Sequence, residues 1–196
     1  MNRNLPAQFV AIALVLMQPC CLRANSKREY KAKDGSRVVI LPIGKLSGHD
    51  GSESRLEFYS PQDQMLCALD YSSEDSEHGF GVVKAAWTPD DNYFVFSLAS
   101  SGGHQPWHTP TLFYGIRDHA VHSLDSYVKA AGISKGDFSL QAPDVVLTEA
   151  LQDRHTAPIR VDLGSLLRVH NPSEHVLRCG NGAVLKPESD SRKPHA

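Results

Sequence analysis

Short runs of β-forming residues, separated by turn residues, dominate this chain from Arg37 onward. Each run has the length of a strand and is rich in Val, Ile, Phe, Tyr or Leu, whereas Pro, Gly, Asp, Asn and Ser lie between the runs. We assign strands to residues 37–43, 55–60, 65–71, 82–87, 93–98, 111–116, 120–124, 145–150 and 158–163. Runs this close in sequence pair as hairpins, so the pattern predicts an all-β fold of antiparallel sheets.

One short helix is expected among these strands, at residues 125–132. Asp125 can cap its start, and Gly132 can end it in the left-handed conformation. Residues 162–169 fit either a strand or a helix. Pro42 favours an edge position or a strand end for the first run, because proline lacks the N–H that a central strand donates.

The composition fits one domain with an ordinary core, since the 196 residues are 41% hydrophobic and 21% charged. The formal net charge is −2, from 20 basic and 22 acidic residues, so we expect no nucleic-acid partner. We predict four regions. They are a targeting segment at 1–24, a polar linker at 25–36, a β domain at 37–185 and a disordered tail at 186–196.

The clearest hairpin spans residues 82–98, with its turn at residues 88–92. Pro89 presets φ in that turn, and Asn92 tolerates a positive φ. Residues 86–96 read AWTPDDNYFVF. This segment resembles the repeat of TolB-like and WD40-like β-propellers, in which a Trp-Ser-Pro-Asp-Gly turn precedes an apolar strand. Thr88 stands here for the serine and Asp91 for the glycine.

The resemblance covers residues 81–128 as one blade and implies a partial-propeller-like fold. A closed propeller needs at least about four blades of ~40–45 residues, whereas residues 37–163 have room for about three. A two-sheet β-structure is the alternative, and an open form could cover its edges by forming a homo-oligomer. Such modules often bind proteins in the periplasm or serve as non-catalytic parts of larger enzymes. The motif itself implies no active residue.

Residues 1–24 have the pattern of a signal peptide. Arg3 gives a positive start, residues 9–17 are apolar without a break, and Pro19 and polar residues follow. The apolar run is shorter than the ~20 residues that a membrane-spanning helix requires, so we expect no transmembrane span. We expect a periplasmic or secreted protein cleaved after Ala24. The alternative is a lipoprotein anchored through Cys20 or Cys21.

Two cysteines remain after such cleavage, Cys67 and Cys179. An even pair in an oxidising compartment usually forms a disulfide, which we predict here. Two buried, unpaired thiols are the alternative. No further thiol is left for a four-cysteine zinc site.

The most unusual segment is residues 100–110, which read SSGGHQPWHTP. Prolines and glycines shape this loop, from which His104, Trp107 and His108 project as candidate ligand-binding residues, with Tyr71 and His78 as candidate neighbours. The spacing of His104 and His108 can place two imidazoles on one metal ion, although this spacing usually does so from a helix, where residues i and i+4 share a face, and not from a loop rich in glycine and proline. A third ligand could come from His78, His119, His122 or the acidic run nearby. The structural alternative places Trp107 in the core and bonds both histidines to the backbone.

Residues 70–79 form that acidic run, in which carboxylates alternate with serines. Such a loop can bind calcium, although its spacing differs from the twelve-residue calcium loop. The run and the histidine loop flank the hairpin at 82–98. If both leave the sheet at the same end, they form one rim carrying His78, His104 and His108.

The sequence contains no nucleophile elbow, His-Glu-x-x-His, phosphate loop or dinucleotide fingerprint. We therefore favour a binding or interaction module in the periplasm or outside the cell, whose partner is a protein or a small ligand of the cell envelope. A metal-dependent hydrolase that uses the loop histidines is one alternative, and a structural envelope protein is another. No cofactor is expected, with zinc or calcium as the open alternatives.

Overall fold

The computed structural model describes residues 26–43, 53–76, 78–101, 110–128, 133–152, 155–169 and 176–187, which form 13 strands and two helices in three sheets. Sheet A has the order β1-β2-β3-β4-β13. Its strands are β1 (Arg28–Lys31), β2 (Arg37–Ile43), β3 (Glu53–Tyr59), β4 (Met65–Asp70) and β13 (Ala183–Leu185). The sheet is antiparallel except that β13 runs parallel to β4.

Sheets B and C complete the fold. Sheet B, of order β12-β8-β7-β6-β5, contains β5 (Phe80–Trp87), β6 (Tyr93–Ser100), β7 (Thr111–Gly115), β8 (Ala120–Ser123) and β12 (Val176–Arg178). Sheet C, of order β11-β10-β9, contains β9 (Ile133–Gln141), β10 (Val145–Gln152) and β11 (His155–Asp162). Helix α1 (Leu124–Val128) follows β8, and α2 (Leu163–Val169) follows β11. Neither of these described helices is long and apolar enough to cross a membrane.

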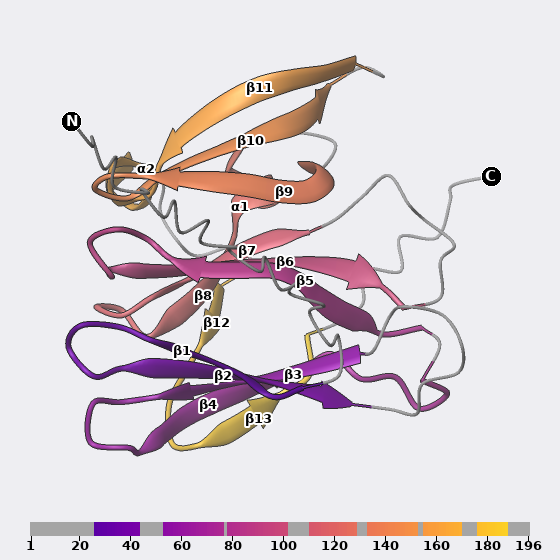
Figure 1. The fold of residues 1–196 in the computed structure, drawn as a ribbon, viewed down its shortest axis with the longest axis vertical. Coiled ribbons are helices and arrows are strands. Elements are labelled where there is room, and N and C mark those ends of the chain that lie inside the picture. The colour runs from indigo at the N-terminus through magenta and orange to yellow at the C-terminus, as the bar shows by residue number, and fades with distance from the viewer. Residues whose placement is uncertain are drawn as a thin grey trace, which may run out of the picture.

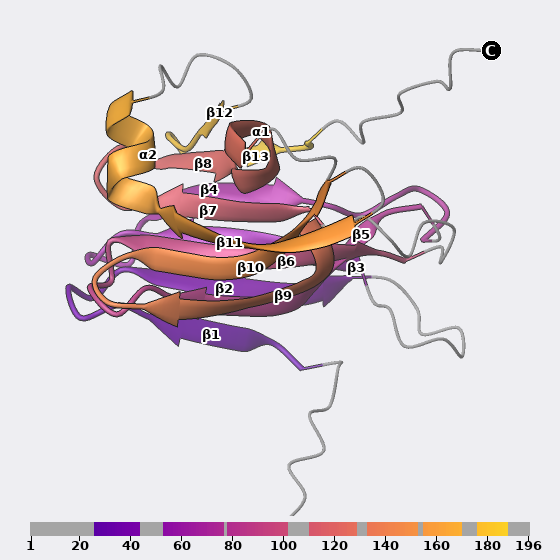
Figure 2. The same ribbon diagram turned by 90° about the horizontal axis from the view of Figure 1, so that it is seen from above.

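The sheets stack as three layers with sheet B in the middle (Figure 1, Figure 2). Strand β6 shows why, because Phe94 and Phe96 face sheet A while Val95, between them, faces sheet C. A strand that is buried on both faces reads as a continuous apolar run. The A–B core consists of Val38, Ile40, Leu56, Phe58, Cys67, Leu69, Tyr71, Val82, Phe94, Phe96, Leu98, Tyr114 and Val121. The B–C core consists of Val95, Phe113, Leu124, Phe138, Val146, Val161 and Leu163.

The predicted all-β, antiparallel fold is confirmed, and each of the nine predicted strands overlaps a strand of the structure. The structure has three sheets, whereas the two-sheet alternative considered from the sequence has two. In the turn at residues 88–92, the residue with positive φ is Asp91 (59°), not Asn92 as the sequence suggested. The reason is that the Asp90 carboxylate accepts hydrogen bonds from the Asn92 backbone and side chain, which fixes Asn92 after the bend.

The structure differs from the predicted boundaries at the N-terminal end of the domain and at the helices. Part of the expected linker at 25–36 is strand β1, which pairs with β2 through four residue pairs. Helix α1 begins at Leu124, and the expected helix end at Gly132 lies outside the described residues. The ambiguous segment 162–169 is α2 from Leu163 onward. The predicted tail beyond residue 187 lies outside the described part of the chain.

The predicted pairing of Cys67 with Cys179 is confirmed. The two sulfur atoms are bonded, with Cα atoms 4.9 Å apart and a sequence separation of 112. Cys67 lies fully buried in β4, and Cys179 lies between β12 and β13. In the chain-entropy account, closing a loop of this length stabilises the fold by roughly 4–5 kcal/mol.

The two ends of the stacked sheets are unlike each other. At the hairpin end, short turns join β1 to β2, β3 to β4, β5 to β6, β7 to β8 and β9 to β10. At the loop end, three longer connections leave sheets A and B, at residues 44–52, 71–79 and 101–110. In Figure 1 the hairpin end lies to the left.

Candidate functional site

At the loop end, the end of the acidic run lies beside the first residue of the histidine loop. Phe80, where β5 begins, pairs with Ser100, where β6 ends. The Ser101 N–H donates to the Gly79 carbonyl at 2.9 Å, so the two connections start side by side. The condition that we set for a shared rim, that both loops leave the sheet at one end, is therefore met by the described residues.

Glu53 is the residue that ties the loop end together. Glu53 is 1% exposed, and its carboxylate accepts four hydrogen bonds from described residues. Oε2 accepts from the Ser73 N–H at 2.8 Å, and Oε1 accepts from the Ser73 hydroxyl at 2.5 Å. Oε1 also accepts from the Gly79 N–H at 2.7 Å and from the Ser101 hydroxyl at 2.9 Å. One buried carboxylate thus joins the start of β3 to both neighbouring loops.

The backbone comes close to this carboxylate at Gly79. A Cβ at this position would lie 2.4 Å from Glu53 Oε1 and 2.4 Å from the Tyr71 carbonyl oxygen. Neither atom can withdraw, since one is buried and hydrogen-bonded and the other is backbone. Any side chain at this position would therefore force the Glu53 network apart.

His78 extends the network to the surface. Its Nδ1 is hydrogen-bonded to Asp75 Oδ2, and Asp75 Oδ1 lies 2.9 Å from the Ser73 hydroxyl oxygen. His78 and Asp75 side chains are 68% and 51% exposed. A carboxylate that orients an imidazole is one half of a hydrolytic triad. The described Ser73 hydroxyl bonds the carboxylates, not the imidazole, so these residues do not form a triad.

Tyr71 faces the core and not the rim. Its side chain is 7% exposed and belongs to the A–B core. Burial raises the pKa of its phenol far above the ordinary value. The hydroxyl has no hydrogen-bond partner among the described residues. A partner that binds at the surface would therefore not reach the Tyr71 ring in this conformation.

The remaining predicted site residues, His104, Trp107 and His108, lie outside the described residues. Of the histidines suggested as a third metal ligand, two are elsewhere in the fold. His119 sits in the turn at the hairpin end, where Nδ1 is 3.0 Å from the Tyr114 hydroxyl. His122 is 1% exposed and has both ring nitrogens engaged, by Asp118 at 2.8 Å and by the Tyr127 hydroxyl at 3.0 Å.

The acidic run does not converge on one point in its described part. The Asp70 carboxylate accepts from the Ser72 N–H and hydroxyl, whereas Asp75 binds His78. Burial opposes ionisation of Asp70, but the two Ser72 hydrogen bonds and the nearby Lys186 lower its pKa below the usual value. Within the described ranges, no three His, Cys, Asp or Glu side chains gather as metal ligands would.

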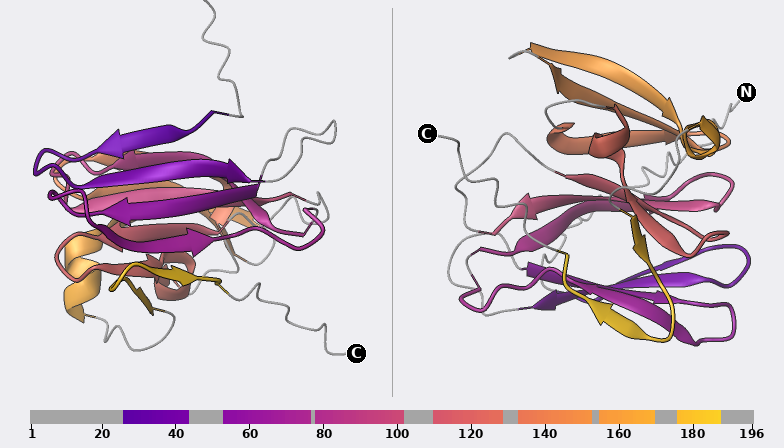
Figure 3. Two further views of the ribbon diagram at one scale, coloured as in Figure 1. Left: turned by 90° about the horizontal axis from the view of Figure 1, so that it is seen from below. Right: turned by 180° about the vertical axis from the view of Figure 1, so that it is seen from behind.

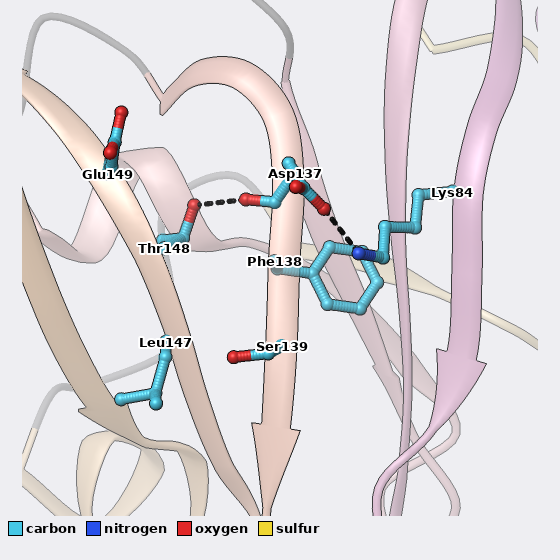
Figure 4. Close-up of a pocket in the computed structure, with 7 residues that line it drawn as sticks. All are labelled: Lys84, Asp137, Phe138, Ser139, Leu147, Thr148 and Glu149. Atoms are coloured by element: carbon cyan, nitrogen blue, oxygen red, sulfur yellow. Dashed lines mark hydrogen bonds and ion pairs between the residues drawn. The ribbon is translucent and has the colours of Figure 1, made fainter.

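A second candidate site is a depression between sheets B and C (Figure 4). The Lys84 ammonium binds the Asp137 carboxylate and lies 5.1 Å from the centre of the Phe138 ring. The hydrogen bond from Lys84 lowers the pKa of Asp137. Thr148 Oγ1 donates to the Asp137 carbonyl at 2.8 Å. Because these groups already satisfy one another, the depression is a weaker candidate than the loop end.

Sequence reasoning did not single out Glu53, Ser73 or Ser101. Their types are common in loops, and no spacing marks them as partners. The fold and the loop end together describe a three-sheet antiparallel β-protein with a hydrogen-bonded loop cluster at one end. The chain matches no protein-family model, no curated protein sequence and no solved structure.

Proposed function

We propose that this chain is an exported binding module that uses the loop end of a rigid β-scaffold to bind a protein or small ligand of the cell envelope. The observation that carries the proposal is the difference between the two ends. Binding residues concentrate in long loops that a rigid scaffold positions. Here the longer connections leave their strands at one end, where Glu53 accepts hydrogen bonds from Ser73 and Gly79 of one connection and from Ser101 at the start of another.

The hairpin end offers little of this kind. Its turns are short and closed by their own hydrogen bonds, as between Ser60 N–H and the Gln64 carbonyl at 2.9 Å. The turn of the β5–β6 hairpin closes the same way, from the Thr88 N–H to the Tyr93 carbonyl at 2.8 Å. Such turns connect strands and leave few groups for a partner.

Two uncovered strand edges also argue against a partner that adds a strand. In β5 a bulge at Val83 interrupts the ladder, and Arg28 Nη2 donates to the Val82 carbonyl at 2.7 Å. In β11, Pro158 lacks an N–H, and proline is tolerated in a strand where that gap faces an open edge. Bulges, charge and proline are the usual protection of edges against pairing. We therefore expect recognition through loop side chains.

The propeller resemblance and the compartment belong to the same proposal. Each sheet begins as consecutive antiparallel strands, β1 to β4, β5 to β8 and β9 to β11, which is the order within propeller blades. That order supports a partial propeller of three blades. The Cys67–Cys179 bond supports export, because disulfides persist in oxidising compartments. Residues 1–24, which carry the expected signal peptide, lie outside the described residues.

The test compares variants in the loops at the loop end with a variant at the hairpin end. The mature protein is immobilised and incubated with an envelope extract, the partner is purified, and its Kd is measured for each variant by calorimetry. We expect Trp107→Ala to weaken binding by roughly tenfold or more, as a central aromatic contact does. His78→Ala should weaken it less. Arg117→Ala, at the exposed hairpin end, is the control and should leave the Kd unchanged.

Two results would reject the proposal. One is a Kd that Arg117→Ala weakens as much as Trp107→Ala does. The other is an unchanged Kd with a large loss of thermal stability in Trp107→Ala, which would assign Trp107 to the core. Peptide mapping of the exported protein tests the compartment, since a mature N-terminus at or near Asn25 is expected.

A further inference from the structure

The C-terminal strap, residues 176–185, covers the outer edges of two sheets. Its first strand, β12, pairs with β8 of sheet B through three residue pairs. Its second strand, β13, pairs with β4 of sheet A through three residue pairs. Seen from behind in Figure 3, the strap crosses from one sheet to the other. Without the strap, β4 and β8 would be open edges.

The strap adds little to the core that it covers. None of its residues is buried, and the Val184 side chain is 50% exposed. Leu177, Cys179 and Leu185 pack against the margin of the A–B core. Every buried residue of that core, including Phe58 and Phe96, lies outside the strap. The three sheets would therefore keep their buried side chains if the strap left.

The attachment is concentrated around Cys179. Its N–H donates to the His119 carbonyl at 2.7 Å, and its sulfur is bonded to Cys67. The turn that follows is held by the Gly182 N–H, which donates to the Leu66 carbonyl at 3.0 Å. Cys67 is fully buried, whereas Cys179 is partly exposed, so a thiolate can reach the bond from the Cys179 side.

We propose that the strap is a redox-sensitive latch. Reduction of the Cys67–Cys179 bond releases residues 176–185 as a unit and uncovers the edges of β4 and β8, while the three sheets remain folded. A dithiol supplies the two electrons and two protons, becomes a disulfide itself and leaves one thiol on each cysteine. Short, exposed strands are the parts of a protein that open locally before the whole unfolds. The disulfide prevents this local opening of the strap.

Hydrogen exchange of the full-length mature chain, followed by mass spectrometry, tests the latch. The protein is compared with and without dithiothreitol, and the intact mass confirms two thiols. We expect the amides of β12, β13 and the outer edges of β4 and β8 to exchange about a hundredfold faster after reduction, as for a local opening. The amides of β2 and β6, in the centres of their sheets, should change less than about twofold.

Cys179→Ala provides a second route without a reductant, and it should match the reduced wild-type protein. Val184→Ala, which keeps the disulfide, is the matched control in the strap and should stay closed. The proposal is overturned if β2 and β6 lose protection together with the strap, because reduction then unfolds the whole chain. It is equally overturned if the strap stays protected once two thiols are present. Reduced wild-type protein decides the question if Cys179→Ala does not fold.

Discussion

Replacing Glu53 with glutamine tests whether one buried carboxylate holds the loop end together. Glutamine keeps the shape of the side chain but has one acceptor oxygen where the carboxylate has two. If the amide oxygen takes the place of Oε1, the NH₂ group faces the Ser73 N–H, and that hydrogen bond is lost. The bonds from Gly79 and Ser101 remain, but they become bonds to a neutral group.

The size of the effect follows from these bonds. A buried N–H left without an acceptor costs about 1–3 kcal/mol, and bonds to a charged group are worth more than neutral ones by about 1 kcal/mol each. Relief of the buried charge offsets part of this loss. We therefore expect Glu53→Gln to lower the free energy of unfolding by about 2–4 kcal/mol. For a chain of this length, that corresponds to a fall in Tm of roughly 4–16 °C.

Glu57→Gln is the matched control on the same strand. Glu57 points to the outer face of sheet A, where its carboxylate accepts from the Tyr59 hydroxyl at 2.8 Å and lies 3.3 Å from the Arg55 guanidinium. Glutamine keeps an acceptor for Tyr59, so the loss should stay below about 1 kcal/mol, as for surface ion pairs. Urea unfolding followed by circular dichroism measures both variants. Equal losses in the two variants would refute the role given to Glu53.

Three further outcomes follow from described contacts. Tyr71→Phe removes a hydroxyl that has no partner among the described residues, so it should change the free energy of unfolding by less than about 0.5 kcal/mol or raise it, whereas Tyr114→Phe loses the bond to His119 and should cost about 1 kcal/mol. Thermal unfolding compares the two variants, and a large loss in Tyr71→Phe would mean that its hydroxyl has a partner in an undescribed segment. Asp144→Asn should stabilise the protein at pH 7, because burial and the charge of Asp162 raise the pKa of Asp144 and make its ionised form unfavourable in the fold. Urea midpoints measured from pH 3 to 7 should show this gain disappear as the pH falls below the unfolded pKa of about 3.9, and a gain independent of pH would contradict the explanation. Asp162→Ala should instead destabilise the protein, because the hydrogen bond from the Ser165 N–H lowers the pKa of Asp162. This stabilisation is present at pH 7 and is lost as the pH falls through the folded pKa. Removing this N-cap of α2 should cost about 1 kcal/mol at pH 7, and no loss at that pH would refute the capping role.

Local patterns predicted the parts of the fold that local physics decides. The hairpin at residues 82–98 has strong β-formers on both sides of a run of turn-forming residues, and it forms as expected except that Asp91, not Asn92, has the positive φ. The Cys67–Cys179 pairing was predicted by counting the cysteines that remain after the expected signal peptide, and the structure contains it. In both cases the signal lies in the residues themselves and needs no knowledge of the tertiary structure.

Other elements depend on partners that sequence reasoning could not supply. Strand β9, ISKGDFSLQ, has a glycine and three charged or polar residues near its middle, and it is a strand because β10 pairs with it across an irregular register. Strands β12 and β13 have three residues each, too few for any periodic signal. Propensity is a weak guide where tertiary contacts decide the pairing.

Glu53 shows the same limit at the candidate site. Successive side chains of β3 point to opposite faces of sheet A. Leu56 and Phe58 face the core, so the alternation assigns Glu53 to the outer face, with Arg55 and Glu57. Alternation would therefore place it in water. It is buried because the connection at 71–79 folds back over the end of the strand and donates to its carboxylate. A pattern within one strand cannot reveal a contact made by another segment.

The outer faces of the stack explain why three sheets suffice. On sheet A the outward side carries the Arg55–Glu57 ion pair, and Arg37 lies over the Tyr59 ring at 3.8 Å. On sheet C the outward Arg160 donates to Gln141 at 2.6 Å. A further sheet packed on either face would bury these charged groups and strip their water, which costs several kcal/mol per ion. The stack therefore ends in solvent on both sides, while the disulfide-bonded strap covers one edge of sheet A, at β4, and one edge of sheet B, at β8.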